Sequence, residues 1–363
     1  MRPSTSRDHS RATAMRASAT DRHEMPRALV EPTLVAYRSA GIGVFGMVMR
    51  FAGMPLEKIA LFMNSSQVSG SHQFSQALRL TFKEGYLAPY RVVGPASIVA
   101  WLMQYSVMGA AFQTCDHALS TVLGVNPVWY GEQLMLPPEK SSRSIDYHFK
   151  ASLKTALSPI LAAAVESNVS NRAEVQRYFG KQMFPKVEAK LNLSPVARAA
   201  GPAFLPNMGR NWIMCQTTFL LTPITYRQFF PQEHKTKTSL FWYGLGMNIF
   251  VGNVAAITQQ ALWGRTLDFA AKNGHINYAS IVKEGLQKEG TAAFFTGPKW
   301  FSRVLMNAPA QGVLPWFYNE VLPLGESTVL SALKFFVYDP VLKEYQEAKE
   351  TTKQATSPLS RST

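Results

Sequence analysis

Arginines that interrupt or bound apolar segments are the candidates for chemistry in this chain. Arg50 follows the apolar residues 39–49, and Arg210 precedes the apolar residues 211–226. In a membrane bundle such arginines face an aqueous interior rather than lipid, because a charge in lipid is costly. The net charge of +14 suggests three kinds of partner: nucleic acid, an anionic membrane surface or an anionic substrate. We disfavour nucleic acid, because the charge is spread and no base-reading motif is present.

The sequence contains no set of residues whose types and spacing indicate catalysis or metal binding. Two cysteines, Cys115 and Cys215, are too few for a disulfide framework or a zinc site, and the seven histidines are dispersed. Gly41, Gly43 and Gly46 match the dinucleotide fingerprint, but the strand and the later acid that it needs are missing. We interpret these glycines as small residues that let membrane helices approach closely. The sequence therefore predicts no enzyme, no metal site and no cofactor.

Six apolar segments, in the order expected for three pairs of helices, would position the arginines. Residues 92–115 and 238–264 contain no Asp, Glu, Lys or Arg. Each is long enough to cross a bilayer, which takes about 20 helical residues. The shorter segments are residues 39–49, 155–165, 211–226 and 304–319. Each alone reads as a soluble core helix, but six in this order favour a membrane bundle.

The chain also repeats itself. Glu84 and Gly85 recur as Glu289 and Gly290, an offset of 205 residues, and a weaker middle copy spans residues 155–222. An internal repeat is a stronger indication of fold than composition is. It predicts three units of roughly 100 residues, each with two apolar helices, in one pseudo-threefold body.

The first 30 residues have the composition of a mitochondrial transit peptide. They contain six arginines, several Ser and Ala, and no lysine. Asp8, Asp21 and Glu24 depart from that pattern, so a disordered basic tail is the alternative.

These features together resemble the mitochondrial carrier family. Each repeat of that family has a transmembrane helix ending in Pro-x-[Asp/Glu]-x-x-[Lys/Arg], a short matrix helix, an acid-Gly pair followed by an aromatic and a basic residue, and a second transmembrane helix. The matching stretches here are Pro55-Leu56-Glu57, Glu84-Gly85 with Tyr90-Arg91, Glu289-Gly290 with Phe295, and Pro206 with Arg210-Asn211. The resemblance spans residues 33–320.

The resemblance implies an all-α fold, a six-transmembrane-helix bundle with pseudo-threefold symmetry and short amphipathic helices on the matrix side. The implied boundaries are a basic N-terminal extension or transit peptide at 1–32, carrier repeats at 33–125, 145–230 and 237–322, and a C-terminal extension at 323–363. We expect a multi-pass protein of the inner mitochondrial membrane, with outer-membrane and peroxisomal relatives of the family as alternatives. Its expected partners are membrane lipid, with cardiolipin as a candidate, and proteins of a membrane complex.

The family's matrix gate, a ring of acid–base pairs between repeats, is incomplete here. The acid positions hold Glu57, Glu166 and Leu262, and the base positions hold Ala60, Val169 and Arg265. Only Glu166 and Arg265 remain as an implied ion pair, and Lys58 is a substitute partner for Glu57. Pro55 is the one kink proline, since Ala164 and Gln260 stand at the other two positions. At the opposite gate, neutral Gln113 and Asn319 replace the charged residues.

The resemblance also implies residues that contact a substrate in the central cavity. They are Arg50, Gln104, Arg210, Asn211 and Arg303. Arg50 resembles a cavity lysine of adenine nucleotide carriers, whereas Arg210-Asn211 resembles the contact pair of carboxylate carriers. For Arg303, snorkelling toward lipid headgroups is the stronger alternative.

Two functions compete on this reading. The first is binding and exchange of a small anionic metabolite, a nucleotide or a carboxylate, across the inner mitochondrial membrane. The second is a transport-inactive structural or docking subunit of a mitochondrial membrane complex. The cavity arginines favour the first and the eroded gates favour the second. A positive funnel would support transport, whereas a cavity plugged by Trp101, Phe219 or Trp300 would support the scaffold.

Overall fold

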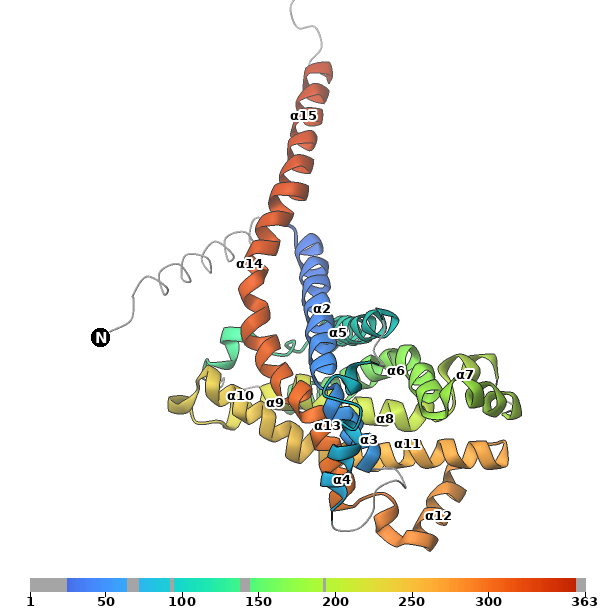
Figure 1. Cartoon of the computed structure of the whole chain (residues 1–363). Coiled ribbons are helices and arrows are strands. Elements are labelled where there is room, and N and C mark those ends of the chain that lie inside the picture. The colour runs from blue at the N-terminus through green and yellow to red at the C-terminus, as the bar shows by residue number, and fades with distance from the viewer. Residues whose placement is uncertain (1–24, 64–71, 92–94, 138–143, 192–193, 357–363) are drawn as a thin grey trace, which may run out of the picture. The chain divides into compact units, whose positions relative to one another are not determined.

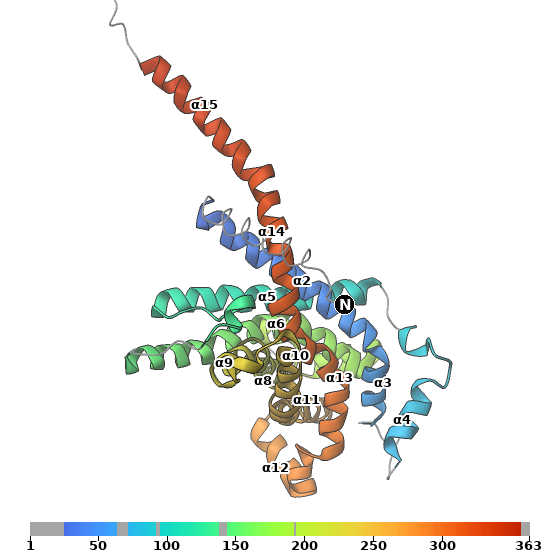
Figure 2. The same cartoon turned by 90° about the vertical axis from the view of Figure 1, so that its left-hand side faces the viewer.

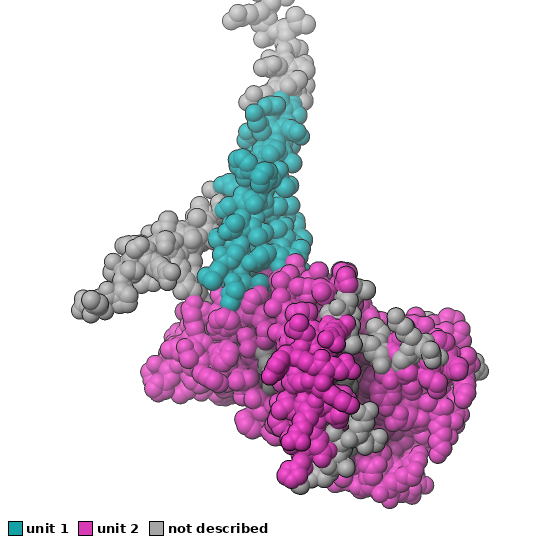
Figure 3. All heavy atoms as spheres, in the orientation of Figure 1, with its two compact units in different colours: residues 1–37, 321–363 teal, residues 38–320 magenta. Residues whose placement is uncertain are grey.

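The computed structural model describes residues 25–63, 72–91, 95–137, 144–191 and 194–356 of the 363 residues. Every regular element among these residues is helical, and they contain no strand (Figure 1). The all-α prediction is therefore confirmed for the described part of the chain. Compactness divides the chain into unit 1, residues Met1–Tyr37 with Val321–Thr363, and unit 2, Arg38–Glu320 (Figure 3).

Unit 1 contains the first part of α2 (Arg27–Ala52), and α14 (Leu322–Leu333), η8 (Lys334–Tyr338) and α15 (Asp339–Thr356). Val30 and Leu34 of α2 pack against Leu330 of α14, and the Tyr37 hydroxyl donates to the Leu322 carbonyl at 3.0 Å. Because these side chains are apolar and buried, they account for the pairing of α2 with α14.

Unit 2 is a ring of helices that pack on their neighbours in chain order. α5 (Pro95–Leu123) packs on α6 (Ile145–Lys190), α6 on α8 (Phe204–Cys215), and α8 on α11 (Asn253–Asn273). α11 and α10 (Lys237–Gly246) pack on α13 (Gly297–Trp316), which packs on α3 (Met54–Met63), as Figures 1 and 2 show. The ring closes where α2 lies against α5.

Glycines make that last contact possible. A Cβ added to Gly43 would lie 1.9 Å from the Ser106 hydroxyl and 2.9 Å from the Leu102 carbonyl, and one added to Gly46 would strike the Tyr105 ring. No larger residue fits there without a shift of α5. The predicted role in close helix packing is confirmed for Gly43 and Gly46.

Two segments at the 205-residue offset contain the same elements. α4 (Gln73–Thr81) and α12 (Tyr278–Glu289) begin at residues 73 and 278. Gly85 and Gly290 then take φ angles of 102° and 61°, which side chains rarely adopt. Each segment continues through a 3₁₀ turn into a long helix, α5 or α13. The sequence echo thus marks a repeated local structure.

The middle of the chain is different, because α6 runs without a break from Ile145 to Lys190. After α6, residues 192–193 lie outside the described ranges, and α7 (Pro195–Ala200) follows. α9 (Thr222–Phe229) comes after α8. The other short elements are η1 (Ala88–Tyr90), η2 (Gly131–Leu134), η4 (Gln232–His234) and η6 (Gly290–Ala293), which are 3₁₀ turns, and η3 (Gln216–Leu221), η5 (Met247–Gly252) and η7 (Phe317–Val321), which are π-helical.

Three helical stretches within the described residues are long and apolar enough to cross a membrane: Ala28–Ala52, Lys237–Asn273 and Gly312–Lys349. The second contains the charge-free residues 238–264, whereas the other charge-free segment, in α5, is not among them. Gln104 and Gln113 make α5 more polar, and α6 and α8 carry charged side chains. The polar residues that lower the hydropathy of these helices are largely those that face inward, as described below.

Candidate functional site

Unit 2 encloses a cavity of about 120 Å³. All five residues predicted to contact a substrate line it: Arg50, Gln104, Arg210, Asn211 and Arg303. Glu57 and Glu166, predicted as gate acids, line it as well. The structure thus brings seven sequence-selected residues from α2, α3, α5, α6, α8 and α13 to one place.

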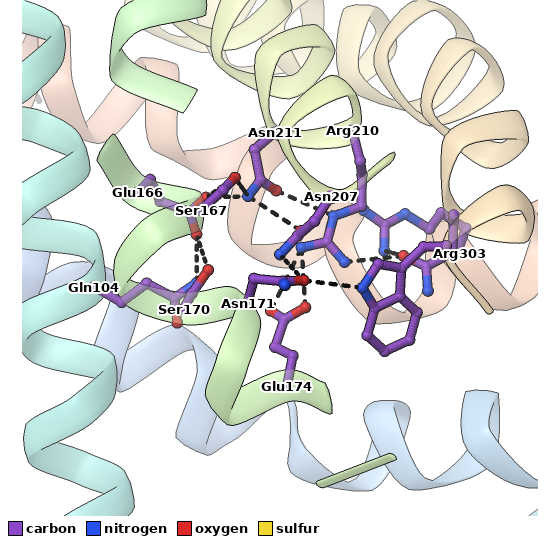
Figure 4. A network of polar contacts seen from close by, with 12 residues as sticks. Gln104, Glu166, Ser167, Ser170, Asn171, Glu174, Asn207, Arg210, Asn211 and Arg303 are labelled. Carbon is purple, nitrogen blue, oxygen red and sulfur yellow. Dashed lines mark hydrogen bonds and ion pairs between the residues drawn. The ribbon is translucent and has the colours of Figure 1, made fainter. Parts of the chain in front are cut away.

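Glu166 lies at the centre of a set of neutral donors (Figure 4). Its side chain is 3% exposed, and its oxygens accept from Gln104 Nε2 at 2.6 Å and from Ser170 Oγ at 3.1 Å. Ser167 and Asn211 also donate to it. Because α6 is continuous here, Ser170 lies one turn after Glu166 on the same face, and Ser167 is its neighbour in the chain, while the two amides come from neighbouring helices.

Asn211 connects Glu166 to Arg210. Its amide nitrogen donates to Glu166, and its amide oxygen accepts from Arg210 Nε at 3.1 Å. An acceptor on one side and a cation on the other leave only one favourable orientation of the amide. Asn207, one turn earlier on α8, accepts from Asn211 and donates to Asn171, which in turn binds the carbonyls of Ala200 and Pro202 ahead of α8.

Arg210 is buried and has two further partners. It is 7% exposed, with Nη2 at 3.1 Å from Glu174 Oε2 and Nη1 donating to Gln260 Oε1 at 3.0 Å. The pair with Glu174 offsets the cost of burying both charges. Arg210 is therefore held in place by acceptors from α6, α8 and α11.

Arg303 is the cation with the fewest partners. It is 5% exposed, and its Nη1 donates at 3.1 Å to the same Gln260 Oε1 that binds Arg210. Its Nε is buried without an acceptor, and it forms no ion pair with the residues that the structure describes. A buried guanidinium whose hydrogen-bond acceptor is one shared neutral oxygen has donors left to bind an anion.

Arg50 and Glu57 form the third charged group of the cavity. The helix is interrupted at Gly53, between α2 and α3, and Pro55 lies in the first turn of α3. Arg50 Nη2 lies 3.6 Å from Glu57 Oε1, and the Arg50 guanidinium lies over the Trp101 ring at 5.4 Å. Arg50, not Lys58, is thus the partner of Glu57.

The predicted ion pair between Glu166 and Arg265 is not formed. Arg265 Nη2 lies 2.6 Å from Glu289 Oε2, and its Nε donates to the Ala293 carbonyl at 3.1 Å. Arg265 therefore binds the turn after α12, whereas Glu166 faces the cavity. Glu289, the acid of the acid-Gly pair in the same repeat, thus binds Arg265, whereas the family resemblance implies that Arg265 pairs with Glu166 of the preceding repeat.

The lining of the cavity contains equal numbers of acids and bases: Arg50, Arg210 and Arg303 with Glu57, Glu166 and Glu174. This is not the positive funnel that the transport hypothesis predicts. Glu174 was missed by sequence reasoning, although it stands eight residues after Glu166 and hence on nearly the same helix face. Gln260 was noted only as a missing proline.

Aromatic side chains close the end of the cavity near Phe219. Phe112 and Phe219 are stacked with ring centroids 4.9 Å apart, and Tyr318 lies 5.8 Å from Phe219. Tyr130, from the connection after α5, packs on Tyr318 at 4.8 Å. Burial raises the pKa of Tyr130 well above its usual range, so that its phenol stays neutral.

The neutral residues of the predicted opposite gate lie at this end but do not bind each other. Asn319 accepts from the Gly131 backbone at 3.3 Å, and Gln113 donates to Ser39 at 3.3 Å. Of the three aromatics considered as plugs, Phe219 belongs to the closure. Trp101 covers Arg50, and the Trp300 indole donates to the Ile249 carbonyl.

The arrangement is suited to binding a small anion. A small anion would meet the guanidiniums of Arg50, Arg210 and Arg303 and several amide and hydroxyl groups, which six helices hold in position. Among the described residues, no group of three His, Cys, Asp or Glu side chains is placed to hold a metal ion. No family model, no curated protein and no solved structure matches this chain.

Proposed function

We propose that this chain is a divergent membrane protein of the mitochondrial carrier type that binds and exchanges a small anionic metabolite. The observation that carries the proposal is Arg303, a buried cation beside Arg210 with an unfilled donor in the central cavity. Burial of such a group is costly unless an anion accompanies it for part of its working cycle. Arg303 is a base of the lining without a carboxylate partner, and we assign it the central role in binding.

The size of the cavity favours a carboxylate over a nucleotide. Its volume of about 120 Å³ has room for several waters, each of which needs roughly 10–15 Å³. Pockets for larger organic ligands are usually about 300–1,000 Å³. In this conformation a small carboxylate fits beside Arg303 and a nucleotide does not.

The proposed setting is the inner mitochondrial membrane. It is supported by the three apolar helices, by the basic N-terminal extension and by the family resemblance. The ring of helices around one cavity and the two segments with matching elements agree with a six-helix carrier bundle. Lipid contact also suits the exposed Phe335 and Phe336, whose side chains are 68% and 73% exposed.

Exchange would need the aromatic closure to open. Alternating access requires two conformations of similar free energy, each closed on a different side of the site. Phe112, Phe219 and Tyr318 close one side through stacking instead of ion pairs. Aromatic pairs contribute about 0.5–1.5 kcal/mol each beyond their area, so a reversible closure is energetically accessible.

A transport-inactive structural or docking subunit is the second candidate. The aromatic closure of one end and the balanced charges of the cavity favour it, because a cavity whose own charges sum to zero needs no substrate to neutralise it. The long connection that supplies Tyr130 also fastens that end of the bundle through the bond from Gly131 to Asn319.

Uptake into liposomes separates the two candidates. We would reconstitute the protein and measure uptake of labelled malate, 2-oxoglutarate, phosphate, ADP and ATP. The variant Arg303→Gln removes the buried cation, and Lys288→Gln is the control because Lys288 is an exposed base on α12. Saturable carboxylate uptake that is lost in Arg303→Gln and kept in Lys288→Gln supports the carrier. Absence of uptake by folded, inserted protein supports the structural role.

A further inference from the structure

The six charges of the cavity divide into two ion pairs and two single charges. Arg50 is paired with Glu57 at 3.6 Å, and Arg210 with Glu174 at 3.1 Å. Arg303 and Glu166 remain, and each is hydrogen-bonded to neutral side chains. Both are almost completely buried.

One continuous chain of hydrogen bonds joins the two single charges. From Glu166 it passes through the Asn211 amide to Arg210, and from Arg210 through Gln260 Oε1 to Arg303 (Figure 4). A change of charge on Glu166 or Arg303 therefore alters the hydrogen bonds of the two amide groups and the one guanidinium that lie between them. The ends interact electrostatically as well, because both are buried in the lining of the same cavity.

The charge balance decides what can be added to this cavity. With every group ionised, three guanidiniums and three carboxylates sum to zero. A monoanion bound at Arg303 would leave one uncompensated negative charge in a buried place, which is unfavourable. A single proton taken up by a carboxylate restores neutrality.

Glu166 is the carboxylate best suited to take that proton. Glu57 and Glu174 each already lie against an arginine, so their oxygens are taken up by ion pairs. Glu166 is bonded to neutral groups, and the hydroxyls of Ser167 and Ser170 can turn to accept a hydrogen bond from a protonated carboxyl. The other charged or titratable groups around it are Glu174, Arg210, Cys215, Arg50, Tyr105 and Arg303.

We propose that this cavity binds a small monocarboxylate together with one proton, which Glu166 accepts, so that the loaded site is neutral. The inference rests on the proposed function, since it assumes that an anion binds at Arg303. In the binding step a carboxylate oxygen of Glu166 forms an O–H bond with a proton delivered by a hydronium ion from the solvent, whose own O–H bond breaks to leave neutral water, and no other covalent bond changes. Release of the anion returns that proton to water, so exchange or uptake by this route moves no net charge.

The test is a proton count during anion binding. The full chain in lipid nanodiscs would be titrated with acetate or lactate by calorimetry, in buffers that differ in ionisation enthalpy. We expect one proton to be taken up for each anion bound. Because the proton is then needed for binding, the affinity for the anion should fall about tenfold for each unit by which the pH rises on the alkaline side of the binding optimum. Binding without proton uptake overturns the proposal but leaves anion binding intact.

Glu166→Gln sharpens the test, because it fixes the lining at one net positive charge. We expect this variant to bind acetate without proton uptake, with little pH dependence and more tightly than the natural protein at alkaline pH. A purely structural role for Glu166 would weaken binding instead. Glu284→Gln is the matched control, since Glu284 forms an exposed pair with Lys288 on α12, and it should keep the proton count.

Two further outcomes are distinguishable. If neither acetate nor lactate binds at any pH, the proposed function fails along with this inference. If Glu166→Gln does not fold, the proton count of the natural protein still decides whether a proton accompanies the anion, and Glu166→Asp, which keeps a carboxyl at a shorter reach, tests the role of Glu166 through a shift in the pH dependence of binding. A proton count of one that persists in a folded Glu166→Gln protein would assign the titration to another group and overturn the role of Glu166.

Discussion

Pro55 and Gln260 occupy the same position in two segments that share their elements, yet they do opposite things. Pro55 lies in the first turn of α3, directly after the interruption at Gly53, whereas Gln260 lies inside the unbroken α11. Proline has no amide hydrogen and cannot continue a helix ladder, so it separates α3 from α2. Glutamine keeps the ladder, and its carbonyl oxygen binds both Arg210 and Arg303.

The difference shows how the residue at one position decides between a helix break and a binding site. A proline at 260 would leave two buried guanidiniums without their shared acceptor. The unbroken α11 and the cavity acceptor therefore depend on the same residue. Between α2 and α3, Arg50 instead contacts an acid, Glu57, across the break.

Gln260→Pro should have the largest effect. A proline inside α11 costs about 3 kcal/mol or more, and the two lost charge-assisted hydrogen bonds add about 1.5–3 kcal/mol each. We expect this variant to be unfolded or severely destabilised in thermal unfolding monitored by circular dichroism. Pro55→Gln is the comparison, because the chain there is already interrupted, and it should retain most of its stability. Equal losses in the two variants would contradict the comparison.

Arg210→Gln should rank second. It removes the cation that lies 3.1 Å from Glu174 in a mostly buried ion pair, and removing one partner of such a pair costs up to about 3–5 kcal/mol. Denaturant unfolding measures the loss, and Glu174→Gln is the complementary single variant. In a double-mutant cycle the two changes together should cost less than their sum, because neither then leaves an unpaired charge. Additive losses would show that the pair contributes nothing.

Helix packing gives a third contrast, between Gly43 of α2 and Gly246 of α10. Gly43→Ala forces a Cβ against the Leu102 carbonyl of α5, and we expect a loss of about 1–3 kcal/mol. An added Cβ at Gly246 has no atom within 4 Å, so Gly246→Ala should stabilise the helix by up to about 1 kcal/mol. Shifts of Tm with opposite signs are the expected result, and shifts of the same sign would refute this account of the packing.

The sequence predicted the lining of the cavity better than its connections. Arg50, Arg210 and Arg303 interrupt or flank apolar segments, and a charged residue in such a place has few favourable positions other than the interior of the bundle. The ion pair between Glu166 and Arg265 required a register between repeats that α6, unbroken for 46 residues, does not preserve. Glu174 lies beyond the apolar segment 155–165, where nothing in the local pattern indicates that α6 continues inward.

The aromatic closure could not be predicted for a related reason. Its outermost residue, Tyr130, belongs to a connection outside the repeat, so no periodic pattern relates it to Tyr318. The all-α class follows from the long apolar segments, which are a local property of the sequence. Partners across the cavity depend on helix register and tilt, which a single sequence specifies only weakly.

Arg303→Gln should have the smallest effect on stability. The sign of that change, no loss or a small gain, would indicate that Arg303 serves binding and not folding. Arg50→Gln breaks a partly exposed pair at 3.6 Å and should cost at most about 1 kcal/mol. Arg303 has no carboxylate partner, so replacing it with a neutral amide removes an uncompensated buried charge and should leave stability unchanged or raise it by about 1 kcal/mol. Thermal unfolding of both variants measures these differences. Because natural proteins retain destabilising buried charges mainly where function needs them, a stable Arg303→Gln protein that no longer binds acetate would locate the anion at this arginine. A large loss of stability would instead mean that Arg303 supports the bundle, which would favour the structural subunit over the carrier.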